Sequence, residues 1–378
     1  MTFAIQELEA RGKQGEHAVR EFLRDRAFPI VEGTTVTFVH HGPASEVRLR
    51  HWIWGLASAQ PFTRLPGTDL WFFRLELPEG SRMEYKLEIV RNGVPDLVLD
   101  PLNPNQAHDP YGANSVVYGT GYVVPDWTQP DPEARLGRLE SHVLFSDVFQ
   151  EPRPIKVYVP ARFREERRYP LLILHDGSDF LRFTGFETVL DNLIHRLEIA
   201  PMIVAFIDSP RRLQEYADDE RHARFLVDEL VPLLEGRFPI LPSASARGLA
   251  GASFGAVASL AAAWRRPGSF GNLFLLSGSF AFTDIGGHDR GPLFDPVVAF
   301  MNAFRKDPGR PAERVFVSCG IYESLIYYNR SLAPVLQATG MDVRYPEAKD
   351  SHNWENWRDR MRGGLSWLYP GPLWMVYE

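Results

Sequence analysis

The sequence predicts an α/β fold in which a doubly wound, mostly parallel sheet follows an antiparallel β-sandwich domain. From about residue 139 onward, apolar β-prone runs alternate with helical patterns, as in a parallel sheet covered by helices. Between residues 33 and 123, short β-prone runs are separated by turns rich in glycine and proline, which is typical of a sandwich. A serine between two glycines stands where an apolar run becomes an alanine-rich helix.

The 378 residues are long enough for two domains. Residues 4–25 fit one amphipathic helix, so residues 1–30 are predicted as an N-terminal helix. Residues 31–124 are predicted as the sandwich, and residues 125–138, acidic and rich in proline, as a linker. Residues 139–378 are predicted as the domain with the parallel sheet.

The predicted sandwich carries more aromatic residues than one buried face requires. The surplus lies in the runs HWIWG (51–55) and LWFFRLEL (70–77). It predicts that the sandwich packs against the second domain or against a substrate, and a thick sandwich core is the alternative.

Composition narrows the class of partner and the compartment. The formal net charge of −7 argues against a nucleic-acid partner, which needs concentrated lysine and arginine. The only cysteine, Cys319, allows no intrachain disulfide. The charged N-terminus lacks the apolar core of a signal peptide, and no uncharged apolar run approaches the roughly 18 residues of a membrane span. We therefore expect a cytoplasmic protein without a membrane partner; a homodimer is compatible with the sequence.

The run from Gly251 to Gly255 reads Gly-Ala-Ser-Phe-Gly and predicts a nucleophile elbow at Ser253. In such an elbow a serine lies in a sharp strand-to-helix turn with its hydroxyl exposed, and flanking side chains would collide with the neighbouring elements. The small residues after Ser253 suit a helix that packs close to a sheet. A tight structural turn is the alternative interpretation.

A serine nucleophile needs a histidine base held by a carboxylate, in the chain order Ser…Asp/Glu…His. Two histidines follow the elbow: His288 in a glycine-rich loop, and His352 between a predicted strand and a helix. We therefore predict His352 as the base. Glu323, in the loop after the strand RVFVSCG, is the predicted acid; Asp350, only two residues before His352, and a Ser–His dyad are the alternatives.

Two backbone N–H groups are expected to bind the developing oxyanion. One belongs to Phe254, the residue after the serine. The other is expected from Ser178, because Gly177 allows the loop after LLILHD to turn tightly. Asp176 is interpreted as shaping this loop rather than as catalytic. No metal or cofactor is expected, since the sequence has no His-Glu-x-x-His, paired cysteines or phosphate-binding glycine loop.

The residues from about 139 to the end resemble the putative-esterase family of α/β-hydrolases, especially its enterochelin-esterase-like branch. The motifs that carry the resemblance are LLILHDGSDFL, PRRLQEY, GLAGASFGAVASL, FLLSGS, CGIYES and SHNWENWR. The N-terminal part resembles the immunoglobulin-like domain that precedes the hydrolase in enterochelin esterases. The resemblance implies Ser253, Glu323 and His352 as a triad, with oxyanion donors at Ser178 and Phe254.

The resemblance also bears on the substrate. It implies Arg212 in the active-site cleft, and we expect Asp176 and Trp354 beside it as substrate-binding residues. An anionic ferric trilactone calls for a basic, aromatic site, to which the following residues could contribute: Arg182, Arg211, Arg212, Arg330, Trp354 and Trp357. The family usually has Gly-Gly before the histidine, whereas this chain has Asp350-Ser351, which changes the rim beside the base.

These observations predict a serine carboxyl-ester hydrolase that acts through an acyl-enzyme on a small-molecule ester, such as an enterochelin-type siderophore trilactone. An esterase or acyltransferase for feruloyl or acyl-carbohydrate esters is the alternative. A non-catalytic glycan-binding protein is the hypothesis from a different class.

Overall fold

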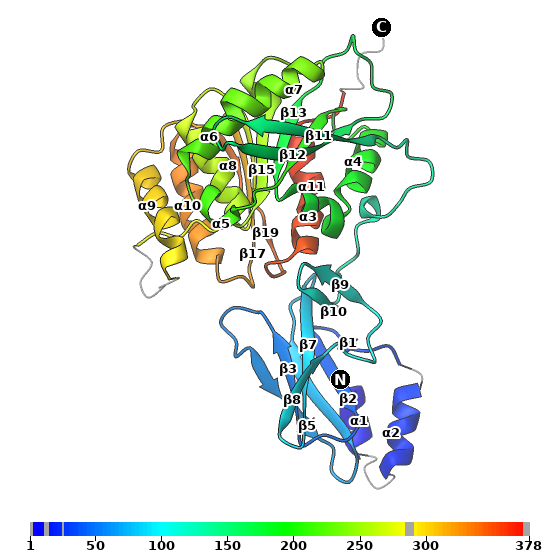
Figure 1. Ribbon diagram of the computed structural model, residues 1–378. Coiled ribbons are helices and arrows are strands. Elements are labelled where there is room, and N and C mark those ends of the chain that lie inside the picture. The colour runs from blue at the N-terminus through cyan, green and yellow to red at the C-terminus, as the bar shows by residue number, and fades with distance from the viewer. Residues whose placement is uncertain (1–2, 11–14, 25, 284–290, 373–378) are drawn as a thin grey trace. The chain divides into compact units, whose positions relative to one another are not determined.

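The computed structural model describes residues 3–10, 15–24, 26–283 and 291–372 (Figure 1). The chain divides into two compact units. Unit 1 comprises Met1–Val124 together with two later segments, Gly320–Glu323 and Ala348–Asn353. Unit 2 comprises Pro125–Cys319, Ser324–Glu347 and Trp354–Glu378.

Unit 1 contains two antiparallel sheets, with strand orders β1-β2-β6-β5 and β4-β3-β7-β10-β9. Strand β8 also belongs to the second sheet, where it pairs with β7 outside this linear order. The strands of the first sheet are β1 (Ile30–Glu32), β2 (Thr35–His41), β5 (Thr63–Arg64) and β6 (Leu70–Glu76). Those of the second are β3 (Glu46–His51), β4 (Ala59–Pro61), β7 (Arg82–Arg91), β8 (Val94–Val98), β9 (Gln106–Asp109) and β10 (Gly112–Tyr118).

The two sheets share one hydrophobic core, so the predicted sandwich is confirmed. Side chains from the first sheet, such as Phe38 and Trp71, pack with Leu49 and Tyr85 from the second. The rings of Phe38 and Tyr85 meet edge to face, with centroids 4.8 Å apart. The alternation of buried and partly exposed residues along β3 follows from the two-residue period of a strand.

The outer face of the first sheet is covered by two short helices, α1 (Ala4–Ala10) and α2 (Gly15–Arg24). The sequence predicts one helix over residues 4–25, whereas the described residues form two. Gly15 has φ +56°, a left-handed value at which an α-helix cannot continue. The helices also explain part of the aromatic surplus, because Phe72 faces them while Trp71 faces the sandwich core.

Unit 2 is built on a sheet with the order β11-β12-β14-β13-β15-β16-β17-β18, and β19 pairs with β17. The strands from β14 to β18 are parallel to one another, and β11 and β12 form an antiparallel extension. The strands are β11 (Arg138–Ser146), β12 (Glu151–Val159), β13 (Leu171–His175), β14 (Ile203–Ile207), β15 (Arg247–Ala252), β16 (Asn272–Leu276), β17 (Arg314–Gly320), β18 (Asp342–Arg344) and β19 (Glu347–Ala348).

Strands β13, β14 and β16 are buried along their whole length, as their continuous apolar runs predict. On one face of the sheet, α4 and α11 supply a core that includes Leu190, Met361 and Leu365. Helix α8 also packs on β13, β15 and β16, and the mostly parallel sheet with its helices confirms the predicted α/β fold. The helices are α3 (Gly177–Asp179), α4 (Phe186–His195), α5 (Arg212–Glu215), α6 (Glu220–Arg224), α7 (Val231–Arg237), α8 (Phe254–Arg265), α9 (Asp295–Lys306), α10 (Ile326–Ala338) and α11 (Trp354–Leu368).

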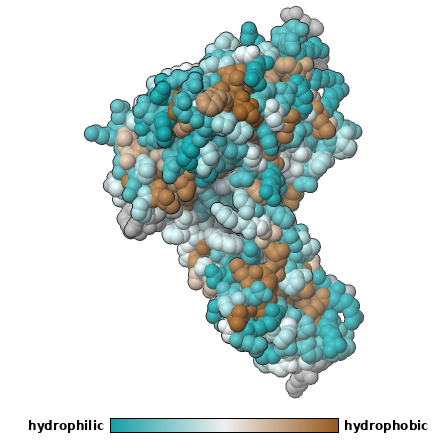
Figure 2. Space-filling model, in the orientation of Figure 1, coloured by the Kyte–Doolittle hydropathy of each residue, from teal (hydrophilic) through white to brown (hydrophobic). Residues whose placement is uncertain are grey.

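The surface is mostly hydrophilic in the view of Figure 2, with hydrophobic patches between the polar residues. Exposed apolar side chains of unit 2 include Val143 and Phe145 on β11. Across the described residues, no helix combines the length and the apolar character that a membrane crossing requires.

Candidate active site

Ser253 lies between the end of β15 and the start of α8, at the carboxyl edge of the parallel strands, where ligands bind in this fold class. Its backbone has φ 55° and ψ −119°, a combination that a residue with a side chain rarely adopts. The N–H of Ser253 donates to the carbonyl of Leu276 on β16 at 2.9 Å, which holds the turn in place. The chain therefore has the strand–turn–helix geometry of an elbow.

Steric contacts explain why glycine stands at both ends of the motif. A Cβ on Gly251 would lie 2.5 Å from the backbone carbonyl carbon and oxygen of Gly255. A Cβ on Gly255 would lie 3.1 Å from the Cβ of His175 and 3.3 Å from a carboxylate oxygen of Asp176. The first glycine lets strand and helix meet, and the second lets the helix approach the end of β13.

Ser279 is a neighbour of Ser253 that the sequence reasoning did not single out. The two side-chain oxygens are 3.0 Å apart, and the N–H of Ser279 donates to the carbonyl of Ser253 at 3.2 Å. Ser279 ends the motif FLLSGS, at the carboxyl end of β16, a position typical of site residues. Phe254 is the first residue of α8, so its amide lies at the positive end of the helix dipole.

Glu323 and His352 form a hydrogen-bonded pair within unit 1. Oε2 of Glu323 lies 2.7 Å from Nδ1 of His352, and its Oε1 accepts from the N–H of Gly320 at 2.7 Å. The Glu323 side chain is fully buried, whereas that of His352 is 38% exposed. A carboxylate at Nδ1 favours the tautomer with the proton on that nitrogen, which leaves Nε2 as the basic atom.

Asp350 has a different set of partners. Both of its carboxylate oxygens lie 3.3 Å from NH1 of Arg82, and Oδ1 also accepts from the side chain of Asn353 at 2.8 Å. Arg82 is fully buried and also bonds Glu84 at 2.9 Å. Asp350 thus takes part in a buried ion-pair network, while Glu323 is the carboxylate at the imidazole.

The titration of Asp350 leads to a test of stability. Burial raises its pKa to about 6 from the ordinary 3.8, although Arg82 opposes the shift. The folded state therefore holds this proton more tightly than the unfolded state. The stabilisation of the folded state by protonated Asp350 is complete below about pH 4 and is lost as the pH rises through about 6. We expect the free energy of unfolding of the wild type, minus that of Asp350→Asn, to fall over this range, by at most about 1.4 kcal/mol per pH unit.

Urea unfolding of both proteins between pH 4 and 7 measures this difference. A difference that stays constant or grows as the pH rises would show that Arg82 outweighs burial.

The loop predicted to supply an oxyanion donor follows β13. Asp176 has φ 54°, in the left-handed region, and a Cβ on Gly177 would lie 2.4 Å from the Cβ of Phe206. The N–H of Ser178 donates to Oδ1 of Asp208 at 3.1 Å, and its hydroxyl to Oδ2 at 2.5 Å. Asp208 was not foreseen, although it directly follows β14 at the carboxyl edge of the sheet. The Ser178 amide, the predicted oxyanion donor, is therefore already hydrogen-bonded to the carboxylate of Asp208.

Arg212 and Asp176, both predicted as substrate-binding, are paired with each other. Nε and NH2 of Arg212 donate to the two carboxylate oxygens at 2.7 Å each. Burial alone would lower the pKa of Arg212, but the bonds to Asp176 outweigh it and the pKa is raised. The guanidinium also lies 5.9 Å from the ring centroid of Phe254. Asp176 thus ties the loop after β13 to Arg212.

Trp354 lies at the start of α11 among other aromatic rings. Its ring centroid is 5.2 Å from that of Phe180 and 4.7 Å from that of Trp357. Trp357 is buried and donates through Nε1 to the hydroxyl of Ser277 at 2.9 Å. Two of the arginines considered for an anionic substrate are paired with carboxylates, Arg211 with Glu151 and Arg330 with Glu347.

A pair of buried histidines lies at the end of β13, beside the loop that carries Ser178. Nε2 of His175 is 2.9 Å from Nε2 of His222, and Nδ1 of His175 is 2.9 Å from the carbonyl of Ala250. Burial lowers the pKa of His175 to about 4 and that of His222 well below its ordinary value, so both are neutral near pH 7. Since Nδ1 of His175 donates to the carbonyl, the bridging proton belongs to His222.

The other candidate histidine, His288, lies outside the described residues. In the part of the chain that the structure describes, no group of three His, Cys, Asp or Glu side chains is arranged to hold a metal ion.

The α/β fold and the family match that follows identify the chain as an ester hydrolase. The family model described as Putative esterase matches residues 146–368, and the chain belongs to this family. An iron(III) enterobactin esterase of Escherichia coli is 23% identical over 330 residues, which cover 80% of each chain.

Solved structures show the same fold. The ferric enterobactin esterase of Salmonella typhimurium has a TM-score of 0.76 and 20% identity, and covers 92% of this chain and 98% of its own. A ferulic acid esterase of Anaeromyces mucronatus has a TM-score of 0.51 and 17% identity, and covers 64% of this chain and 94% of its own.

Proposed function

We propose that the protein is a serine carboxyl-ester hydrolase in which Ser253 is the nucleophile, His352 the base and Glu323 the acid. The observation that carries the proposal is the strained backbone of Ser253 between β15 and α8. Such strain persists where the surrounding structure enforces it, and it clusters at catalytic residues. The bond between Glu323 and Nδ1 of His352 supports the same assignment, in the chain order of this fold class.

The reaction then runs in two halves. Nε2 of His352 takes the proton from the hydroxyl of Ser253 as its oxygen attacks the ester carbonyl. The tetrahedral intermediate places its negative charge at the amides of Phe254 and Ser178, and Glu323 stabilises the imidazolium. The imidazolium protonates the leaving alcohol as the C–O bond breaks. Water, deprotonated by His352, then hydrolyses the acyl-enzyme and restores Ser253.

The Ser178 amide has a further requirement in this mechanism. It donates to Asp208, so the carbonyl oxygen of the substrate has to replace that carboxylate. The developing oxyanion carries more charge than the ground-state carbonyl, so it competes best at the transition state.

For the substrate we propose a siderophore trilactone of the enterobactin type. The support is the likeness to enterobactin esterases, which extends over both units. Feruloyl or acyl-carbohydrate esters are the second candidate, because ferulic acid esterases share the fold over about two thirds of the chain. The pairing of Arg211 and Arg330 with carboxylates reduces the positive charge available to an anionic siderophore. This reduction favours the feruloyl or acyl-carbohydrate esters.

A substrate panel tests the proposal. Wild type and Ser253→Ala are compared on p-nitrophenyl esters, a feruloyl sugar, and enterobactin with and without iron. Hydrolysis by the wild type alone supports a serine hydrolase, and the highest kcat/KM identifies the substrate class. Faster turnover of the feruloyl sugar would replace the siderophore proposal, and no hydrolysis of any ester would overturn the function. The immunoglobulin-like topology, the cytoplasmic location and a homodimer stay predictions from the sequence.

A further inference from the structure

Helix α5 is a single turn, Arg212–Glu215. Its first residue, Arg212, pairs with Asp176 in the loop after β13, called the oxyanion loop from here on because it carries the proposed donor Ser178. One turn of helix is not stable by itself, since nucleation is unfavourable. Its place in unit 2 has to be set by contacts outside the helix. Two of its four residues, Arg212 and Glu215, make bidentate ion pairs with other elements.

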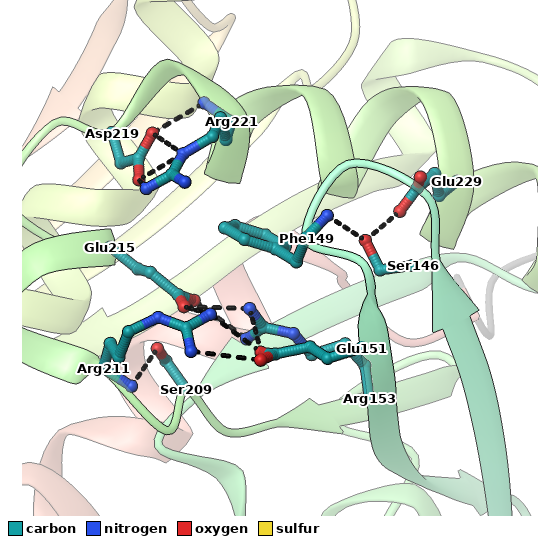
Figure 3. Close-up of polar contacts among 10 residues, drawn as sticks. All are labelled: Ser146, Phe149, Glu151, Arg153, Ser209, Arg211, Glu215, Asp219, Arg221 and Glu229. Carbon is teal, nitrogen blue, oxygen red and sulfur yellow. Dashed lines mark hydrogen bonds and ion pairs between the residues drawn. The ribbon is translucent and has the colours of Figure 1, made fainter.

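Glu215 joins α5 to β12. Its two carboxylate oxygens accept from NH1 and NH2 of Arg153 at 2.8 Å each, and Figure 3 shows the two side chains pointing toward one another. Arg153 is 3% exposed and Glu215 is 1% exposed, so the pair is taken out of water. The guanidinium carbon of Arg153 lies 3.9 Å from the ring centroid of Phe149, which fixes its plane.

A second arginine and a second glutamate complete this group. Arg211 donates to both oxygens of Glu151 at 2.9 and 3.0 Å, and it lies 3.1 Å from Glu215. Glu151 also pairs with Arg153 at 2.8 Å. The four formal charges cancel, and each carboxylate contacts both arginines (Figure 3). The direction of α5 relative to β12 is thereby restricted.

At its other contact, α5 fixes the loop before Ser178. Arg212 holds both oxygens of Asp176, whose left-handed backbone turns the chain into Gly177 and Ser178. The same carboxylate lies close to Gly255, one residue after Phe254. Displacing Arg212 would therefore disturb the loop that carries Ser178, one proposed oxyanion donor. It would also disturb the Asp176 carboxylate beside Gly255, next to Phe254, the other proposed donor.

We propose that Arg153 and Glu215 are positioning residues of the esterase site, acting through α5 and the Arg212–Asp176 pair on the oxyanion loop. The inference rests on the proposed function. Stability alone does not account for the pair, because replacing a buried ion pair by apolar residues of similar volume is often neutral or stabilising. A positioning role does account for the pair, because its bidentate geometry holds α5 in a fixed direction relative to β12.

The experiment is a double-mutant cycle on a small ester such as p-nitrophenyl acetate. Glu215→Gln and Arg212→Met are each expected to lower kcat by about 10- to 100-fold with little change in KM, because an oxyanion contact acts in the transition state. The double variant should be no worse than the more damaged single variant by more than about threefold, since both act on one loop. Hydrogen exchange at residues 176–180 should become faster in Glu215→Gln.

Glu229→Gln is the matched control. Glu229 accepts from the hydroxyl of Ser146 and the N–H of Val148 at the turn between β11 and β12, near the same group (Figure 3). It should lower the melting temperature and leave kcat within about twofold. If Glu215→Gln does not fold, Arg153→Lys, which keeps the positive charge, takes its place in the cycle.

The inference is wrong if the Glu215 or Arg153 variant only loses stability with kcat unchanged, or if its effect multiplies with that of Arg212→Met. A wild type without esterase activity would instead overturn the proposed function. Hydrogen exchange at residues 176–180 still decides the positioning role in that case.

Discussion

Replacing Ser253 by alanine is expected to lower ester hydrolysis by about 10³-fold or more while the protein stays folded. The substitution removes the only atom proposed to attack the carbonyl and leaves the binding contacts in place. Loss of Oγ costs one hydrogen bond, to Ser279, so stability should change little. Initial rates and circular dichroism on the same samples measure both effects.

Ser279→Ala is the comparison for this variant. It removes the neighbouring hydroxyl 3.0 Å away and keeps the nucleophile, so we expect less than about tenfold loss. An organophosphonate should label the wild type and Ser279→Ala at Ser253, and leave Ser253→Ala unlabelled. Activity of Ser253→Ala within tenfold of the wild type would refute the assignment.

Glu323→Gln is expected to lower kcat by about 10³- to 10⁴-fold. The change keeps the shape of the side chain but removes the charge that stabilises the imidazolium. The new amide can also donate to Nδ1 of His352 and thereby favour the wrong tautomer. The N–H of Gly320 retains an acceptor if the amide oxygen takes the place of Oε1, so the loop should keep its form.

Asp350→Asn separates the two acids. It changes the charge of the buried group around Arg82, so its effect on stability should follow the pH dependence described above. Its kcat should stay within about tenfold of the wild type, since the carboxylate at His352 is that of Glu323. Should Asp350→Asn prove the more damaging to kcat, the acid has been assigned to the wrong residue.

The sequence predicted the α/β sheet and the elbow because both depend on short-range signals. The apolar runs of β13, β14 and β16 and the glycines around Ser253 report burial and close approach directly. The interruption between α1 and α2 was missed because the apolar residues on both sides of the polar stretch 11–17 were assigned to one helix, whereas the left-handed backbone of Gly15 breaks the helix.

Long-range pairs could not be predicted from one sequence. Asp350 was considered as an alternative acid and as part of the rim beside the base, because nothing local indicates that it pairs with Arg82, far away in the chain. The sequence also suggested a clean boundary in the linker after residue 124. A cut there would remove Arg82 and Ser81, which bond Asp350 and Tyr322 within unit 1. The loops that carry Glu323 and His352 would lose these partners.

Asp208 at the Ser178 amide affects what happens after the acyl-enzyme is cleaved. Ester hydrolysis releases an acid that ionises near neutral pH, and a carboxylate beside the amide repels a second carboxylate. When Asp208 regains the Ser178 amide, it replaces the product at the same donor. In the proposed mechanism, this exchange limits inhibition of the enzyme by its own acid product.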